Sequence, residues 1–275
     1  MLNDSDQARA GRAAASTNAG RARIKVNGAR KTYQTQSGSV DALAETTFTM
    51  DTGEFVSVLG PSGCGKSTLL TMMAGLTPTS GGSIVVDGRE VTEPYPDLGV
   101  VFQRDLLMPW RRVKDNVLIQ AEYRHMPRDA SSARADELLA MVGLSDFADK
   151  YPHELSGGMR QRVAICRALL HDPGILFMDE PFGALDALSR DQLNLDLQQI
   201  WSGSKKSVFF VTHSIPEAIF LSDRVLVLGP RPGRMLDDIR IDLERPRELG
   251  IRETPRFAEY TKHIREVFES SGILH

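Results

Sequence analysis

A glycine-rich loop restricts what this chain can fold into more than any other feature. Residues 60–67 read GPSGCGKS and match the pattern G-x-x-x-x-G-K-[ST] in full. The apolar run EFVSVLG leads into this loop, and the helix-forming run KSTLLTMMAGL follows it. A strand, a glycine loop and a helix in this order predict a phosphate-binding loop inside an α/β domain.

Backbone N–H groups of such a loop converge on a β-phosphate at a helix N-terminus, where the helix dipole also favours anions. We expect Lys66 to reach the β- and γ-phosphates and the Ser67 hydroxyl to bind Mg²⁺. The same N–H donors predict a lowered pKa for the Cys64 thiol. A chance glycine turn with a surface lysine is disfavoured, because the motif is complete and stands between a strand and a helix. The predicted nucleotide-binding residues of this segment are Gly60, Pro61, Ser62, Gly63, Cys64, Gly65, Lys66, Ser67 and Thr68.

Apolar, strand-like runs alternate with helix-forming segments in the later part of the chain. The strand-like runs are GILFMDE, SVFFVTH and RVLVLG. This alternation predicts a parallel sheet covered on both faces. A polar, helix-forming region at residues 113–144 has no strand signal and predicts an inserted helical subdomain.

The composition agrees with one large α/β domain. The chain has 275 residues, of which 41% are hydrophobic, enough for a large core. Its 33 basic and 36 acidic residues leave a net charge of -3, and this balance disfavours electrostatic binding of nucleic acid. No apolar run approaches the ~18 residues of a membrane span. Two cysteines, Cys64 and Cys166, cannot form a disulfide framework, as expected for a reducing cytosol.

The two ends of the chain differ in character. Residues 1–22 are rich in Ala, Arg, Ser and Asn without an apolar stretch, which predicts a disordered tail rather than a secretory signal. A transit peptide is the alternative, but Asp4 and Asp6 disfavour it because such peptides are poor in acidic residues. From Pro255 onward, one apolar stripe predicts a helix that packs on its own domain. The stripe consists of Phe257, Tyr260, Ile264, Val267 and Phe268.

Two carboxylates end the apolar run GILFMDE. An aspartate at such a strand end can hold Mg²⁺, and a neighbouring glutamate can polarise an attacking water. We therefore assign Asp179 to the metal and Glu180 to the water. A solvated strand end is the alternative, and the four apolar residues before the pair make it the weaker interpretation.

Other candidate residues are ordinary when taken singly. Gln103 and His213 each follow an apolar run, where a surface or structural role is common, and Tyr33 could be a packing residue. The stretch LSGGMRQR opens a helix with a serine and two glycines, at residues 156–158, but carries no lysine. Their order along the chain is what makes these residues informative.

Taken together, Tyr33, GPSGCGKST, Gln103, LSGGMRQR, ILFMDEP, the triplet ALD at residues 184–186 and His213 resemble the ABC-type ATPase family. The resemblance runs from about Ile24 to Gly229. It implies ATP and Mg²⁺ as ligands, with Tyr33 stacked on adenine, Gln103 at the metal and the attacking water, and His213 at the γ-phosphate. Asp186 of the ALD triplet joins the predicted nucleotide-binding residues.

The family resemblance also implies a fold class. This is a P-loop NTPase fold with a mainly parallel core sheet, an antiparallel β subdomain and an inserted helical subdomain. The expected domains are a tail at 1–22, an ABC-type nucleotide-binding domain at 23–245 with its helical subdomain at about 104–165, and a C-terminal helical extension at 246–275.

In this family two copies pack head to tail, and the serine-glycine loop of one copy closes over the γ-phosphate held by the other. The resemblance therefore implies that Ser156, Gly157 and Gly158 complete the site of a second copy, so no lysine is needed there. ATP binding would close such a dimer and hydrolysis would let it open. Met159 and Arg160 stand where many family members have glutamines.

Several kinds of ABC protein remain to be distinguished. Ribosome-acting members carry two such domains in one chain and DNA-repair members contain long coiled coils, neither of which is present. A soluble, cluster-assembly type of ATPase stays open as an alternative. A guanine-nucleotide switch protein is disfavoured because an Asn-Lys-x-Asp motif is missing.

Two stretches favour an importer. VFQRDLLMPWRRVKDNV and VTHSIPEAIFLSDRVLVLGPRPGRM resemble the ATPases of the nitrate, taurine and alkanesulfonate uptake group, and the PRPGR loop is the most group-specific part. By itself this loop would be a plain Pro-Gly turn. The resemblance implies a peripheral position on the cytoplasmic face of the membrane, with permease subunits as partners, an external solute-binding protein acting indirectly, and no nucleic acid.

Overall fold

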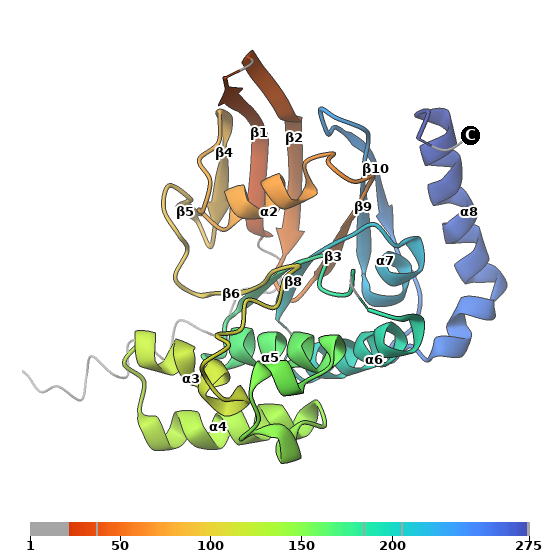
Figure 1. Ribbon diagram of the computed structural model, residues 1–275. Coiled ribbons are helices and arrows are strands. Elements are labelled where there is room, and N and C mark those ends of the chain that lie inside the picture. The colour runs from red at the N-terminus through yellow and green to blue at the C-terminus, as the bar shows by residue number, and fades with distance from the viewer. Residues whose placement is uncertain (1–21, 37, 184, 205, 274–275) are drawn as a thin grey trace, which may run out of the picture.

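The computed structural model describes residues 22–36, 38–183, 185–204 and 206–273. The predicted tail therefore lies outside the described residues except for its last position, and so does Ala184 of the ALD triplet. Two β-sheets form the framework, and helices cover them (Figure 1). Among the described residues, no helix is both long enough and apolar enough to cross a lipid bilayer.

The larger sheet has six strands in the order β10-β9-β3-β8-β7-β6. Its members are β3 (Phe55–Leu59), β6 (Leu98–Val101), β7 (Ile175–Asp179), β8 (Ser207–Thr212), β9 (Arg224–Leu228) and β10 (Met235–Arg240). All neighbours are parallel except β10, which pairs antiparallel with β9. Every residue of β3 and β8 is buried, as expected for strands covered on both faces.

The smaller sheet is antiparallel, with the order β2-β1-β4-β5. Its strands are β1 (Ala22–Thr35), β2 (Gly38–Asp51), β4 (Gly81–Val86) and β5 (Arg89–Glu90). In the second half of β2, exposed and buried residues alternate regularly, which is the pattern of a sheet with one face on a core and one in solvent.

Two cores lie on opposite faces of the larger sheet. Helix α2 (Lys66–Met73) and the smaller sheet cover one face, where Phe209 of β8 stacks on Phe48 of β2. The next residue, Phe210, points to the other face and contacts Phe182. Successive residues of a strand face opposite sides, so a single strand contributes to both cores. The second core is covered by α5 (Gly157–Leu169), α6 (Ala187–Ser204) and α7 (Ile215–Leu221).

A helical segment extends the second core below the sheet in Figure 1. It consists of α3 (Val113–Tyr123), α4 (Arg128–Met141), η2 (Ser145–Phe147) and η3 (Pro152–Glu154), and it leads into α5. Val117 of α3 and Leu138 of α4 are buried in the same core as α5. The prediction of helices without strands at residues 113–144 is confirmed.

The C-terminal segment passes through η4 (Leu249–Glu253) to α8 (Pro255–Ser270), which lies beside α7 (Figure 1). Four residues of the predicted apolar stripe are buried, namely Phe257, Tyr260, Ile264 and Phe268, whereas Val267 is half-buried. The prediction that this helix packs on its own domain is confirmed.

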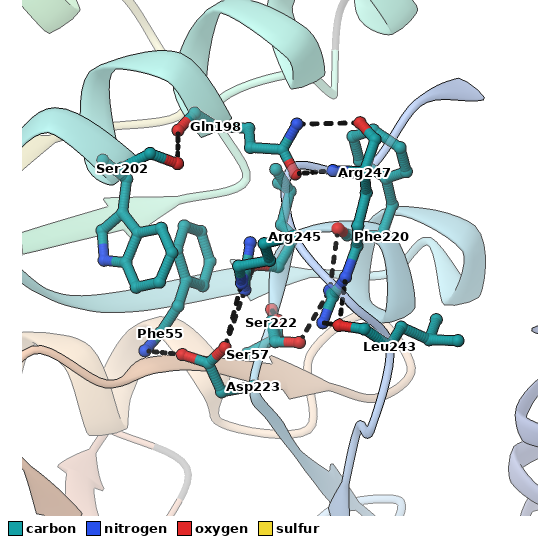
Figure 2. Close-up of polar contacts among 12 residues, drawn as sticks. Phe55, Ser57, Gln198, Ser202, Phe220, Ser222, Asp223, Leu243, Arg245 and Arg247 are labelled. Atoms are coloured by element: carbon teal, nitrogen blue, oxygen red, sulfur yellow. Dashed lines mark hydrogen bonds and ion pairs between the residues drawn. The ribbon is translucent and has the colours of Figure 1, made fainter. Parts of the chain in front are cut away.

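A buried arginine joins α6, α7 and the segment before η4. Arg247 is only 2% exposed, and its guanidinium donates hydrogen bonds to the carbonyl oxygens of Ile219, Phe220 and Ser222 at the end of α7. Figure 2 shows Gln198 of α6 bonded through both ends of its amide to the backbone of Arg247. These contacts satisfy carbonyl groups that a helix end leaves without partners.

Candidate active site

Four neighbouring strands of the larger sheet end at one edge, and each leads to a predicted site residue. β3 leads into the phosphate loop, β8 is followed by His213, β7 ends at Asp179, and Gln103 comes shortly after β6. The register keeps these ends level, since Asp179 pairs with Val211 of β8. The carboxyl ends of parallel strands are the usual binding edge of an α/β sheet.

The phosphate loop turns from β3 into α2 through two glycines in the left-handed region. The φ angle is 75° at Gly63 and 102° at Gly65. A Cβ at Gly65 would lie 2.5 Å from the carbonyl oxygen of Ala42, so a side chain cannot be accommodated there. The backbone of β2 therefore lies directly against the loop at the point where α2 begins.

Lys66 is the first residue of α2, and its side chain is buried under the loop. Its Nζ donates hydrogen bonds to the carbonyl oxygens of Gly60 at 2.9 Å and Pro61 at 3.0 Å. The same nitrogen lies 3.3 Å from Oε1 of Glu180. The loop thus holds a cation at its centre, with one carboxylate facing it.

Ser67 and Asp179 meet at the base of the loop. Ser67 Oγ donates a hydrogen bond of 2.8 Å to Asp179 Oδ1. Burial raises the pKa of the Asp179 carboxyl, the Ser67 hydrogen bond lowers it, and the charge of Glu180 raises it. A desolvated carboxylate beside a hydroxyl oxygen is a donor set that suits a hard cation such as Mg²⁺.

Glu180 is held from two sides. Its backbone adopts a φ of 44°, which is uncommon for a residue with a side chain, and its N–H donates to the carbonyl of Val211 at 2.9 Å. One carboxylate oxygen faces Lys66, and the other lies 3.0 Å from Nδ1 of His213. Gln103 Nε2 and Glu180 Oε2 both lie 3.8 Å from where a Cβ on Gly183 would stand, so the two side chains face a common space.

A cavity of about 480 Å³ opens over the loop. Its lining residues are Tyr33, Ala42, Ser62, Gly63, Gly65, Lys66, Ser67, Thr68, Gln103, Glu180 and Arg231. Half of the residues predicted for nucleotide binding line this cavity. His213 and Asp179 reach it through Glu180 and Ser67.

Comparison with known proteins agrees with this geometry. The sequence profile of the ABC transporter family matches residues 43–183. The chain is 48% identical over 257 residues to the taurine import ATP-binding protein TauB of Rhizobium johnstonii, covering 91% of this chain and 98% of the relative. This chain belongs to the ABC transporter family. The predicted family is therefore confirmed.

Further relatives of the ABC family extend the comparison. An uncharacterized ABC transporter ATP-binding protein of Methanocaldococcus jannaschii is 47% identical over 247 residues, which are 90% of this chain and 91% of the relative. A solved ATP-binding cassette, a dimeric structure of a post-hydrolysis state bound to ADP and Pi, matches with a TM-score of 0.72 and 30% identity. It covers 80% of this chain and 100% of that structure. The predicted fold class is confirmed as well.

Two lining residues of this ABC site were not predicted from the sequence. Ala42 belongs to β2, and Arg231 belongs to the turn between β9 and β10. A third unpredicted neighbour, Lys31, places its Nζ 5.0 Å from the centroid of the Tyr33 ring. Lys31 could have been found from the period of two along a strand, because residues i and i+2 share a face. Arg231 had no such local signal beyond the PRPGR loop itself.

The predicted lowering of the Cys64 pKa is wrong. Its side chain is 1% exposed and belongs to the core between the two sheets, so burial raises the pKa of the thiol despite the nearby charge of Lys66. Gly63 and Gly65, on either side of Cys64, line the cavity, whereas the Cys64 side chain belongs to the core. Both cysteines are free, and burial raises the pKa of Cys166 to about 12.

The serine-glycine loop typical of ABC proteins opens α5 but does not line the nucleotide cavity of its own chain, as far as the described residues go. Ser156 is the N-cap, and its hydroxyl accepts a hydrogen bond of 3.3 Å from the N–H of Met159. The nearest side-chain atoms to a Cβ at Gly157 would be 3.9 Å away, so this loop is open on its outer side.

Asp186 likewise caps a helix instead of lining the cavity. Its carboxylate accepts hydrogen bonds from the N–H of Ser189 at 2.9 Å and from the Ser189 hydroxyl at 2.7 Å. The helix cap lowers the pKa of this carboxyl group. A nucleotide contact of Asp186 therefore remains a prediction.

Proposed function

We propose that this chain is the ATP-hydrolysing subunit of an ABC importer for a small solute such as nitrate, taurine or another sulfonate. The names of its relatives support this, since several of them are taurine import ATP-binding proteins that are 44–48% identical. These names do not favour the alternative, a soluble ABC-type ATPase with non-membrane partners.

The position of Glu180 carries the catalytic part of the proposal. This carboxylate lies in the cavity between Lys66 Nζ and His213 Nδ1, and it faces the same space as Gln103. A carboxylate so oriented can accept a proton from a water that attacks the γ-phosphate. The phosphates would replace Glu180 as the partner of Lys66, which frees the carboxylate for the water.

Ser67, Asp179 and Gln103 would hold Mg²⁺ through their side-chain oxygens. The pair of oxygens that Ser67 and Asp179 bring together fits this ion. When bound, Mg²⁺ would neutralise the negative charge that develops during phosphoryl transfer. His213 orients Glu180 through the contact of its Nδ1. We expect His213 also to contact the γ-phosphate in the cavity.

The remaining lining residues hold the nucleotide. The backbone N–H groups at 62–68 surround the phosphates at the start of α2, where the helix dipole favours anions. Tyr33 is 38% exposed and has Lys31 close to its ring, so ring surface remains available for stacking on adenine.

A second copy completes each site. Ser156, Gly157 and Gly158 lie outside their own cavity but form an open helix start, which can bind the γ-phosphate of a neighbouring chain. The similar cassette solved as a dimer with ADP and Pi supports this arrangement. We therefore assign the closed state to two copies with two ATP molecules between them.

The importer places this chain on the cytoplasmic face of a membrane, bound to permease subunits. An external solute-binding protein would select the solute. Affinity-tagged chain is expected to co-purify from detergent-solubilised membranes with a membrane-spanning subunit. Recovery with soluble proteins alone would contradict the importer assignment.

Replacement of the proposed base tests the catalytic assignment. Glu180→Gln removes the proton acceptor and keeps the size of the side chain, so steady-state ATP hydrolysis should fall by about 10²–10⁴-fold. Binding of ATP should persist. Glu90→Gln, at an exposed glutamate of β5, is the control and should hydrolyse ATP like the unmodified protein. Hydrolysis by Glu180→Gln at the level of this control would remove Glu180 from the mechanism.

A further inference from the structure

The turn between β9 and β10 lies directly on the phosphate loop. A Cβ at Gly233 would stand 1.9 Å from the carbonyl oxygen of Cys64, so only glycine allows the two backbones to approach this closely. The turn is also bonded to β2, because Ala44 N–H donates to Gly233 O at 2.8 Å and Gly233 N–H donates to Ala42 O at 3.3 Å. In Figure 1 this turn lies beside β2. Its position relative to the nucleotide cavity is thus fixed on two sides.

This fixed turn brings Arg231 into the cavity. Its side chain lines the cavity together with Tyr33 and Ala42, and its Nε donates a hydrogen bond of 3.3 Å to the carbonyl oxygen of Asp41. Within the described ranges, no carboxylate forms an ion pair with Arg231. Its charge is therefore available to a ligand.

The other cation of the cavity is differently placed. Lys66 Nζ is buried, bonded to two carbonyl oxygens of the loop and paired with Glu180. Arg231 belongs instead to the part of the lining where the β9–β10 turn is bonded to β2. A guanidinium keeps its charge at any physiological pH and binds phosphate oxygens through a planar set of N–H donors.

We propose that Arg231 is a nucleotide-binding residue whose guanidinium contacts a phosphate oxygen of ATP. This inference rests on the proposed function, because it takes ATP as the ligand of the cavity. The anchored turn explains how a residue so distant in sequence from the phosphate loop can act there. Phosphate is favoured over the base because the turn is seated on the loop itself, at Cys64 and Gly233.

Nucleotide affinity tests this role without depending on hydrolysis. Calorimetric titration of Arg231→Gln with MgATP and MgGTP should give dissociation constants raised about tenfold, by the same factor for both nucleotides, as one charged hydrogen bond contributes. The affinity should also depend less steeply on salt concentration. Arg231→Lys keeps the charge and should bind MgATP more tightly than Arg231→Gln.

Arg234→Gln is the matched control. Arg234 is an exposed arginine of the same turn and does not line the cavity, so its removal makes the same change in net charge and should leave affinity unaltered. Equal losses for Arg231→Gln and Arg234→Gln, or no loss for Arg231→Gln, would overturn the inference. A changed ratio of ATP to GTP affinity would reassign Arg231 to the base. If the unmodified chain bound neither nucleotide, the proposed function itself would fail.

Discussion

Cys64 occupies the phosphate loop, yet its side chain belongs to the core between the two sheets. A Cβ on Gly60 would lie 2.9 Å from the Cys64 sulfur, which shows how closely the thiol is enclosed. Burial raises the pKa of this thiol and disfavours the thiolate, the form that reacts with alkylating reagents. The Cys64 side chain thus packs the phosphate loop onto the core.

Cysteine alkylation should therefore be slow in the native protein. At pH 8, iodoacetamide is expected to modify Cys64 and Cys166 of the native protein at less than about one tenth of the rate in the chain unfolded in guanidinium. Because the thiol pKa values are raised, the rate of alkylation should increase with pH only at a higher pH than for a free thiol. Peptide mass spectrometry measures both sites. Rapid native modification of Cys64 that MgATP prevents would show instead that the thiol faces the nucleotide.

Sequence patterns predicted individual residues unevenly. Lys66, Ser67 and Glu180 follow from local motifs, because Lys66 and Ser67 begin the helix after the glycine loop and Glu180 directly follows a buried strand. The direction of the Cys64 side chain did not follow, since a loop motif defines backbone donors and says nothing about which face a side chain takes. Arg231 could not be found either, because its role depends on a contact between segments far apart in sequence.

At the scale of elements, α7 connects the site to the rest of the second core. The helix begins two residues after His213, with Ser214 as its N-cap. Arg247 binds three carbonyl oxygens at its other end, and Gln198 holds the backbone of Arg247 to α6 (Figure 2). Arg247, in the segment before η4, thus caps the C-terminal end of α7, and the site residue His213 lies just before the N-terminal end of the same helix.

Loss of this arginine should destabilise the fold. Arg247→Met removes the donors and leaves several buried carbonyl groups without partners, so the free energy of unfolding should fall by about 3 kcal/mol. Urea unfolding followed by circular dichroism measures the change. Arg240→Met, at an exposed arginine of β10, should change the same free energy by less than about 0.5 kcal/mol. Similar values for both variants would contradict the role given to Arg247.

Elements with a regular pattern were predictable, and contacts between them were not. The fully buried strands β3 and β8 appear in the sequence as short, mainly apolar runs, and α8 appears as an apolar stripe with helical spacing. The position of the β9–β10 turn on the phosphate loop depends on tertiary packing. A Pro-Gly motif predicts a turn but not the segment against which the turn packs.

For the whole molecule, the serine-glycine loop lies outside its own cavity, and we propose that it completes the site of a second chain. Ser156→Arg places a bulky charge where the γ-phosphate of the other copy is expected, while the phosphate loop of the same chain stays intact. This variant should bind ATP as a monomer and fail to dimerise with ATP. Lys66→Ala has the opposite defect, because it loses the cation of its own loop.

Mixing the two variants tests the head-to-tail arrangement. In a mixed dimer both defects fall in one composite site and the other site is intact, so part of the ATP hydrolysis should return. Sedimentation with and without ATP measures the mixed dimer directly. Absence of both hydrolysis and mixed dimer would mean that each loop serves its own chain.

The open start of α5 also has a consequence for inheritance. In the proposed head-to-tail dimer, a substitution at Ser156 would leave the chain that carries it able to fold and bind ATP, but it would damage the site of the copy with which it pairs. In a cell that makes both forms of the chain, altered copies would pair with normal ones and impair them. Such an allele would act in a dominant-negative manner, whereas an allele that prevents folding would simply be recessive.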